Sequence, residues 1–260
     1  MSVIKSAVQY LIRRYNGFYT TSAKVTEKVE ILISKQGNIL DQYGFVQGTD
    51  KASIQRLEDY FRIGHDYLRH YDYLFAKFRT EKFSLVEFGC YKGDSLRMWE
   101  QYFPHAEIFG VDLDEKSKQH EANRIHIVIG DATSQETYDS LKAATGGHAF
   151  IILDDASHAW SDQRRSLELF WDMVSPGGFY VIEDVVCGTA GSYNPPKVLD
   201  AQPFFNYMQD RCEFLRWCVD WKPEELSYHF AHLPPQVQKI EREMDMCMFI
   251  PGAVIVRKKA

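Results

Sequence analysis

The feature that most constrains the fold of this chain is a series of five short apolar runs, each ending in one or two acidic residues. Segments of roughly 10 to 20 helix-compatible residues separate the runs. Short, nearly continuous apolar strands that alternate with helices are typical of a parallel sheet covered on both faces. The carboxyl ends of such strands share one edge, where ligands bind, so the acids should converge there. They are Glu87, Asp112, Asp131, Asp154–Asp155 and Glu183–Asp184.

The length of the whole chain, 260 residues, suits one large α/β domain with a helical extension. Residues 1–80 are predicted to form the N-terminal helical extension, and residues 81–260 the α/β domain. Within the extension, the polar and glycine-bearing stretch 41–53 predicts a break, whereas HDYLRHYDYLFAKF (65–78) has helical apolar spacing and predicts a helix with one buried face. Near the C-terminus, two β-rich pieces broken at Pro251–Gly252 predict closing or edge strands.

Composition narrows the classes of partner. A net charge of −6 argues against a general nucleic-acid binder. No apolar stretch approaches the ~18 residues that a membrane helix needs. The N-terminal segment predicts an amphipathic helix packed on the body or on a partner subunit, with attachment to a membrane surface as the alternative, rather than a signal peptide. The five cysteines form no CxxC or zinc pattern, which favours free thiols in a reducing compartment. We therefore expect a cytoplasmic homo-oligomer that acts on a small molecule.

The first strand runs into a glycine-bearing loop, VEFGCYKGDSLRMWEQYF (86–103). Gly89 and Gly93 allow a tight turn and a close approach to a ligand, and Ser95 or Asp94 can cap the helix that follows. The loop lacks the G-x-G-x-x-G of dinucleotide-binding dehydrogenases and the lysine-serine signature of phosphate loops. Both of those classes are therefore disfavoured.

This acid-x-glycine-x-x-x-glycine loop resembles motif I of the class I S-adenosylmethionine-dependent methyltransferases. The GDA at 130–132 and the SPGG at 175–178, a turn before the fifth strand, extend the resemblance over about residues 83 to 260. It implies a Rossmann-like, doubly wound, mostly parallel seven-stranded sheet. It also implies that Asp112 accepts hydrogen bonds from both ribose hydroxyls and that Asp131 lies on the adenine side. The full set of cofactor-binding positions is then Glu87, Gly89, Gly93, Ser95, Asp112 and Asp131.

The fourth and fifth strands predict a metal site. Asp155 ends one of them and Glu183 and Asp184 end the other, with room for a single helical crossover between. Three carboxylates that meet at one edge repel each other unless they share a cation, and all-oxygen ligation favours Mg²⁺ or another hard divalent ion. Strand alternation turns Asp154 to the opposite face. Helix caps and solvated charges are the structural alternative for the three carboxylates.

A narrower resemblance concerns the stretches DDASH and PGGFYVIED. They resemble the metal-dependent sugar O-methyltransferases of antibiotic biosynthesis, typified by the mycinamicin enzymes. This resemblance implies metal ligands at Asp155, Glu183 and Asp184, with His158 as the general base that accepts the proton of a sugar hydroxyl. QGTDKAS and the segment from residue 65 extend it to about residue 47. Candidate acceptor contacts from that region are Lys51, His65, His70 and Tyr71, and the glycines and prolines of 188–196 suit a lid.

Other interpretations stay open at this point. One is a metal-independent methyltransferase for a phenol or an amine. Another is a hydroxylase, which would want iron held by two histidines and a carboxylate, although only His158 stands at a strand end. A third is a non-catalytic S-adenosylmethionine-binding protein. The acceptor itself, whether a nucleotide sugar, a polysaccharide unit or a natural-product glycoside, is not specified by the sequence.

Overall fold

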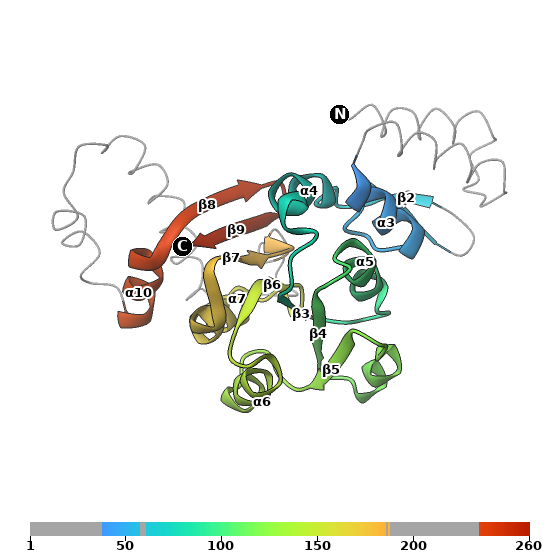
Figure 1. Cartoon of the computed structure of the whole chain (residues 1–260). Helices are drawn as coiled ribbons and strands as arrows, with labels where there is room; N and C mark the ends of the chain where they lie inside the picture. The colour runs from blue at the N-terminus through green and yellow to red at the C-terminus, as the bar shows by residue number, and fades with distance from the viewer. Residues whose placement is uncertain (1–37, 58–60, 186, 188–233) are drawn as a thin grey trace, which may run out of the picture. The chain divides into compact units, whose positions relative to one another are not determined.

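The computed structural model describes residues 38–57, 61–185, 187 and 234–260 (Figure 1). These residues form two compact units: one holds 38–57, 61–83, 90–109 and 116–127, and the other holds 84–89, 110–115, 128–185, 187 and 234–260. The expected N-terminal helix and the expected lid at 188–196 lie outside the described residues. The division of the chain at residue 80 stays a prediction.

The central element is a seven-stranded sheet with the order β5-β4-β3-β6-β7-β9-β8. The chain enters at β3, adds β4 and β5 on one side, and then returns to add β6 and β7 on the other, which is a doubly wound topology. β3 pairs parallel with β6, and β6 with β7, whereas β9 runs antiparallel to β7 and β8. The predicted fold class is confirmed. The strands are β3 (Ser84–Phe88), β4 (Glu107–Asp112), β5 (Ile125–Ile129), β6 (Ala149–Asp154), β7 (Val174–Ile182), β8 (Met244–Ile250) and β9 (Ala253–Lys258).

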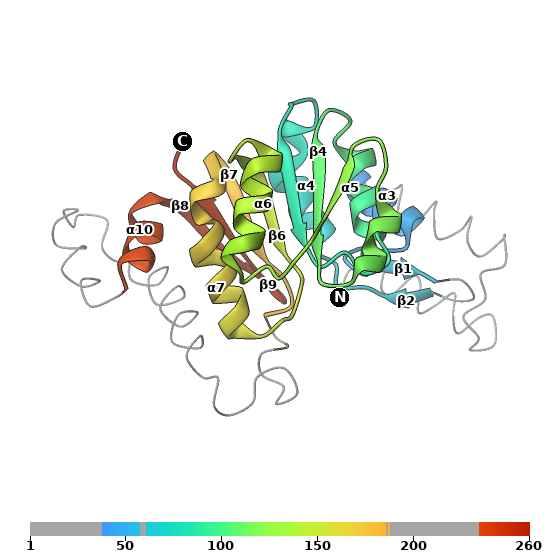
Figure 2. The same cartoon turned by 90° about the horizontal axis from the view of Figure 1, so that it is seen from below.

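In the second unit, helices lie against the inner strands. Figure 2 shows α6 and α7 side by side in front of β6 and β7. Ile151, Ile152 and Leu153 of β6 have no exposed surface, and the rings of Phe88 and Phe170 lie 4.8 Å apart. This burial on both faces accounts for the nearly continuous apolar strand sequences. The helices are α6 (Gln135–Thr145), α7 (Trp160–Phe170) with η3 (Trp171–Met173), and α10 (Pro235–Glu243).

β7 begins earlier than the sequence indicated. The SPGG stretch, expected as a turn before the strand, lies inside it, where the register with β6 shifts between Ala149 and Ile151. Gly177 adopts a left-handed φ of +73°, and a side chain on Gly178 would meet the carbonyl oxygen of Phe150 at 2.6 Å. The glycines therefore serve an irregular strand rather than a turn.

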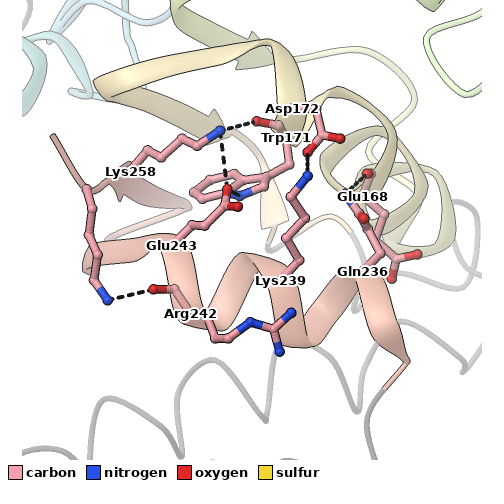
Figure 3. Close-up of polar contacts among 9 residues, drawn as sticks. Glu168, Trp171, Asp172, Gln236, Lys239, Arg242, Glu243 and Lys258 are labelled. Carbon is pink, nitrogen blue, oxygen red and sulfur yellow. Dashed lines mark hydrogen bonds and ion pairs between the residues drawn. The ribbon is translucent and has the colours of Figure 1, made fainter. Parts of the chain in front are cut away.

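A polar network fastens α10 to the end of α7 and to β9 (Figure 3). The indole N–H of Trp171 donates to Glu243 Oε2 at 2.9 Å, and Lys258 pairs with the same carboxylate at 3.3 Å. Gln236 Nε2 donates to the carbonyl oxygen of Glu168 at 2.8 Å, and Lys239 pairs with Asp172. These contacts fix where the chain re-enters the described part of the fold after residue 233.

In the first unit, the break predicted over 41–53 is wrong for its first half, because the helix α3 (Ile39–Gln47) runs through it. Asn38 caps this helix by accepting from the backbone N–H of Asp41 at 3.0 Å. Gly44 lies inside this helix, and the close packing of Leu68 explains why the position is a glycine, because a side chain there would collide with Leu68 Cδ1. The helix predicted in 65–78 is confirmed as α4 followed by η1, with Leu68, Tyr71 and Phe75 buried. The elements before β3 are α3 (Ile39–Gln47), β1 (Ile54–Arg56), β2 (Phe61–Ile63), α4 (Leu68–Phe75) and η1 (Ala76–Phe78), and α5 (Asp94–Tyr102) and η2 (Glu115–His120) follow it.

Two further expectations concern the described residues. The C-terminal pair of strands is confirmed as the hairpin of β8 and β9, which turns at Pro251–Gly252. Cys90, Cys187 and Cys247 are free thiols. Within the ranges that the structure describes, no helix combines the length and apolar character needed to cross a membrane.

Candidate functional site

The candidate site lies at the carboxyl ends of β6 and β7. These strands pair in parallel with Asp154 opposite Ile182, so the segments that follow β6 and β7 leave the sheet at the same level. The backbone N–H of Glu183 donates to the carbonyl oxygen of Asp154 at 2.9 Å, and that of Asp155 donates to Phe88 at 3.0 Å. The two acidic strand ends are therefore held side by side, as the parallel pattern predicted.

Asp155, His158 and Asp184 form a compact cluster at these ends. One donor atom from each lies within 4.8 Å of the others. His158 Nδ1 is 4.0 Å from Asp155 Oδ1, and His158 Nε2 is 3.9 Å from Asp184 Oδ2. Ligands on opposite sides of a hard divalent ion are about 4 to 5 Å apart, and carboxylate oxygens are the ligands such ions prefer. The carboxylates of Asp155 and Asp184 and their spacing therefore fit two ligands of a single divalent cation, with His158 beside them.

Two of the three cluster residues hold a strained backbone. His158 has a φ of +58° and Asp184 a φ of +53°. Residues other than glycine rarely adopt this left-handed region, and where they do the surrounding structure must hold them there. Strain of this kind concentrates at functional sites. The sequence offered no signal for it.

Glu183 differs from its neighbour Asp184. Its side chain is 1% exposed and is not one of the three groups of the cluster. Its carbonyl oxygen accepts a hydrogen bond from Gln163 Nε2 at 2.9 Å. The structure thus brings together Asp155 and Asp184 of the predicted metal trio, with His158 beside them. The ligand role of Glu183 stays a prediction.

Asp154, the residue before Asp155, is buried, with 2% of its surface exposed. The pKa of this carboxyl is raised to about 7, chiefly by burial and then by the neighbouring charges of Asp155 and Asp162. A hydrogen bond from the Ala156 backbone N–H acts in the opposite direction. Burial, together with Asp154, also raises the pKa of Tyr180. Asp154 is thus an interior carboxyl that supports the loop carrying Asp155 and His158.

The predicted cofactor positions of the second unit gather around the ends of β3, β4 and β5. Gly89 has a φ of +90°, and a side chain there would collide with the carbonyl oxygen of Asp155. Glu87 is fully buried on β3. The carboxylate of Asp112 accepts from the Asp114 N–H at 2.9 Å, and that of Asp131 accepts from the Thr133 N–H at 2.7 Å. Their roles toward a cofactor stay predictions.

In the first unit, Gly93 is the N-cap residue of α5 and has a φ of +71°. The expectation that Ser95 or Asp94 caps this helix is wrong, because Gly93 is the capping residue and no side chain caps it. Asp94 pairs instead with Arg97, and burial raises the pKa of its carboxyl. Ser95 is 8% exposed. A cofactor role for Gly93 and Ser95 remains a prediction.

The four candidate acceptor residues also belong to the first unit. Lys51 and Tyr71 are buried, His70 is half-buried and His65 is exposed. The ring of Tyr71 packs 5.7 Å from Phe75 and 6.2 Å from both Tyr67 and Trp99, so its ring belongs to the interior of this unit. Burial lowers the pKa of His70, with a contribution from Arg69. Acceptor contact by these residues stays a prediction.

Two residues that touch the site were missed in the sequence. Trp160 Nε1 donates to the carbonyl oxygen of Val185 at 2.8 Å, and Gln163 Nε2 to that of Glu183. Both come from α7. A tryptophan and a glutamine three residues apart on a helix carry no signal that would distinguish them from ordinary packing residues.

Comparisons with known proteins give a consistent picture. A family described as "Methyltransferase domain" matches residues 86–185. The chain is 38% identical over 132 residues to mycinamicin VI 2''-O-methyltransferase of Micromonospora griseorubida. The matched region covers 48% of this chain and 33% of that protein. The chain is 34% identical over 207 residues to 8-demethyl-8-alpha-L-rhamnosyl tetracenomycin-C 2'-O-methyltransferase of Streptomyces olivaceus, covering 75% and 51%. The chain thus spans about a third to a half of the length of these relatives.

Among solved structures, the fold is shared with the MycE methyltransferase of the mycinamycin pathway. In its complex with Mg, SAH and mycinamycin VI, that protein is 23% identical to this chain, with a TM-score of 0.64 and coverage of 85% of this chain and 53% of its own. A second crystal form with Mg and SAH gives a TM-score of 0.65, 22% identity and coverage of 94% and 62%. At this identity the likeness establishes the fold.

Proposed function

We propose, from the premise that residues 86–185 of this chain are a methyltransferase domain, that the protein is an O-methyltransferase that methylates a sugar hydroxyl. In this proposal S-adenosylmethionine is the methyl donor and a divalent cation, Mg²⁺ first, assists the reaction. The observation that carries the proposal is the cluster of Asp155, His158 and Asp184 at the carboxyl edge of the sheet.

The residues of the cluster divide into two roles. Asp155 and Asp184 offer the carboxylate oxygens that a hard cation prefers, and Glu183 is the third proposed ligand. When bound, the cation supplies charge that stabilises a developing alkoxide. His158 lies about 4 Å from both cluster carboxylates, which would orient its ring and stabilise the imidazolium that forms when it accepts a proton.

The proposed reaction moves one proton and one methyl group. His158 accepts the proton of the acceptor hydroxyl, the new oxygen–methyl bond forms as the sulfur–methyl bond of the donor breaks, and S-adenosylhomocysteine leaves. A sugar hydroxyl is a very weak acid, so removal of its proton needs a base, for which His158 is proposed, and a cation held by Asp155, Glu183 and Asp184 would supply further charge stabilisation. The remaining work of the protein is positioning, because the donor sulfur, the methyl group and the acceptor oxygen must lie in line. The proposed donor-binding groups are Glu87, Gly89, Gly93, Ser95, Asp112 and Asp131.

The names of the relatives support a glycoside acceptor. They describe O-methylation at the 2'' position of mycinamicin VI and at the 2' position of a rhamnosyl tetracenomycin. A deoxysugar attached to a natural product is therefore the first acceptor class to test, with nucleotide sugars and polysaccharide units second. Candidate acceptor contacts remain Lys51, His65, His70 and Tyr71, and small molecules rather than nucleic acid are the proposed partners. A cytoplasmic homo-oligomer remains the expected form.

The test is a methylation assay with metal-stripped protein. The full chain is treated with a chelator, dialysed and incubated with S-adenosylmethionine and a panel of glycosides and nucleotide sugars, with S-adenosylhomocysteine as the readout. We expect turnover on at least one sugar, lost in chelator and restored by Mg²⁺. A full rate in chelator would show a metal-independent enzyme, and donor binding without turnover on any acceptor would favour a non-catalytic protein.

A matched pair of variants separates the site from general effects of lost charge. Asp155→Asn removes a carboxylate from the cluster, whereas Asp172→Asn removes one that pairs with Lys239 on α10. We expect Asp155→Asn alone to raise the Mg²⁺ concentration needed for half-maximal activity by about 10-fold or more.

A further inference from the structure

The segment that carries Asp184 is held from outside by a helix that supplies no ligand. Asp184 has a left-handed φ of +53°, so its position depends on the two peptide planes that flank it. The plane after it is fixed by main-chain bonds: Val185 N–H donates to Gly252 at 3.0 Å, and Cys187 N–H donates to the Asp184 carbonyl oxygen at 2.9 Å.

The plane before Asp184 is held by a side chain. Its carbonyl oxygen, that of Glu183, accepts a hydrogen bond from Gln163 Nε2 at 2.9 Å. One turn earlier on the same face of α7, Trp160 Nε1 donates to the carbonyl oxygen of Val185 at 2.8 Å. The two donors of α7 therefore hold the carbonyl groups on either side of Asp184.

Gln163 is an unusual residue for its surroundings. It is 1% exposed, and its Oε1 is buried without a hydrogen-bond partner among the described residues. A buried amide with one unsatisfied oxygen is costly, and an apolar side chain of the same size would avoid that cost. Packing alone thus gives no reason for a glutamine here, whereas an N–H donor to the Glu183 carbonyl does.

We infer that Gln163 and Trp160 are positioning residues that hold Asp184 in the conformation in which it faces Asp155 and His158. The inference deepens the proposed function, because it rests on the use of Asp184 as a ligand of a divalent cation. Loss of the Gln163 donor frees the peptide plane before Asp184, and loss of the Trp160 donor frees the Val185 carbonyl one plane beyond Asp184. Either change lets the Asp184 carboxylate move away from Asp155. The expected result is weaker binding of the cation, since groups that orient ligands typically contribute 10- to 100-fold to affinity.

The test uses Mn²⁺ bound to the full chain, measured by electron paramagnetic resonance without any acceptor. Gln163→Met keeps the volume and removes the donor, and Trp160→Phe keeps an aromatic ring and removes the indole N–H. We expect each variant to bind Mn²⁺ about 10-fold more weakly than the wild type. The free energy of unfolding of Gln163→Met should change little, because removal of the unsatisfied Oε1 offsets the hydrogen bond that the Glu183 carbonyl loses.

The same unit offers a matched control for each change. Gln236→Met removes a glutamine donor to the Glu168 carbonyl, and Trp171→Phe removes an indole donor to Glu243. Both bonds belong to the α10 network, so their loss should affect stability but leave Mn²⁺ affinity unchanged. A merely structural role for Gln163 and Trp160 would give the same pattern as these controls.

The outcomes are distinguishable. If the wild type binds Mn²⁺ in competition with Mg²⁺ and both α7 variants bind it equally well, the inference is wrong while the proposed function stands. If the wild type itself binds no Mn²⁺, the metal assignment fails and the inference falls with it.

Discussion

His158 stands between two carboxylates at the end of β6, and its side chain is 20% exposed. A base in this position can reach an acceptor and still be oriented from both sides of its ring. Its backbone has a left-handed φ of +58°, and its two ring nitrogens lie 4.0 Å from Asp155 Oδ1 and 3.9 Å from Asp184 Oδ2. Position and orientation together make His158 the residue whose loss should be most specific to catalysis.

The first prediction therefore concerns His158→Ala. We expect the methylation rate to fall by about 100-fold or more, since general-base catalysis commonly contributes 10²- to 10⁴-fold. Affinity for S-adenosylmethionine, measured by calorimetry, should be unchanged. His148→Ala is the control, because His148 is exposed just before the start of β6. Equal activity of the two variants would remove His158 from the mechanism.

Asp41 in the first unit shows the energetic effect of burying a single carboxyl. It is 4% exposed and accepts from the Ser53 backbone N–H at 2.7 Å and from its hydroxyl at 2.5 Å. Burial raises the pKa of Asp41 above its ordinary value of 3.8, and the charge of Asp66 adds to the rise, whereas the Ser53 bonds and Arg69 act against it. The folded state therefore holds this proton more tightly than the unfolded state.

A pH-dependent contribution to stability follows from that shift. Because the folded pKa is raised, the contribution of Asp41 is fully present below about pH 3.8 and is lost as the pH rises through the folded pKa. Asp41→Asn carries no titrating group at this position. We expect the free energy of unfolding of the wild type, relative to Asp41→Asn, to fall as the pH rises from 4 upward in urea titrations. A difference that is constant with pH would contradict the assignment.

Among the elements, the loop after β3 shows why a glycine is needed where strand ends converge. Gly89 combines a φ of +90° with a close approach to the Asp155 carbonyl oxygen, so a side chain there would be strained and would also collide with backbone. Gly146 at the C-terminal end of α6 has a φ of +68°, but a Cβ atom added there would meet nothing within 4 Å. A side chain at Gly146 would therefore cost backbone strain alone, whereas one at Gly89 would cost strain and a steric clash.

We predict that Gly146→Ala lowers the free energy of unfolding by about 1 kcal/mol, the cost of a left-handed alanine. Gly89→Ala should lower it by about 3 kcal/mol or more, because the clash with Asp155 adds to the same strain. Because that clash displaces Asp155, Gly89→Ala should also weaken Mn²⁺ binding. Equal losses of stability in the two variants, measured by denaturant titration, would mean that the loop relaxes around the new methyl group.

The helix α7 connects two regions of the second unit. Its first turn donates to the Asp184 segment through Trp160 and Gln163, and the residue that follows its last turn, Trp171, donates to Glu243 of α10. The C-terminal hairpin contributes as well, because Gly252 accepts the N–H of Val185. The site is thus supported by elements that lie far from it in the sequence.

For the whole molecule, the sheet was the part that the sequence predicted best. Apolar runs ending at Glu87, Asp112 and Asp131 marked strands because a strand buried on both faces needs nearly continuous apolar residues. The pairing of Asp155 with Asp184 followed from the rule that neighbouring parallel strands end together. Both inferences depend on local sequence and on general topology.

The features that were missed depend on tertiary contacts. The helix α3 runs through a glycine-bearing stretch because Gly44 makes room for Leu68, a partner that the local sequence does not reveal. The left-handed conformations of His158 and Asp184, and the bonds from α7, arise only when distant segments meet. The helix expected at the N-terminus and the lid lie outside the described residues.

The positive φ angles at His158 and Asp184 also limit how this site can be redesigned. A library intended to change metal preference would vary these positions, yet β-branched residues such as valine and threonine are poorly tolerated in the left-handed region. Asparagine and glycine fit that backbone without added strain. Asp184→Asn is therefore the natural first substitution, because it changes the charge presented to a cation while the chain keeps its path. Directed evolution of the donor set is expected to proceed through asparagine before any bulkier ligand.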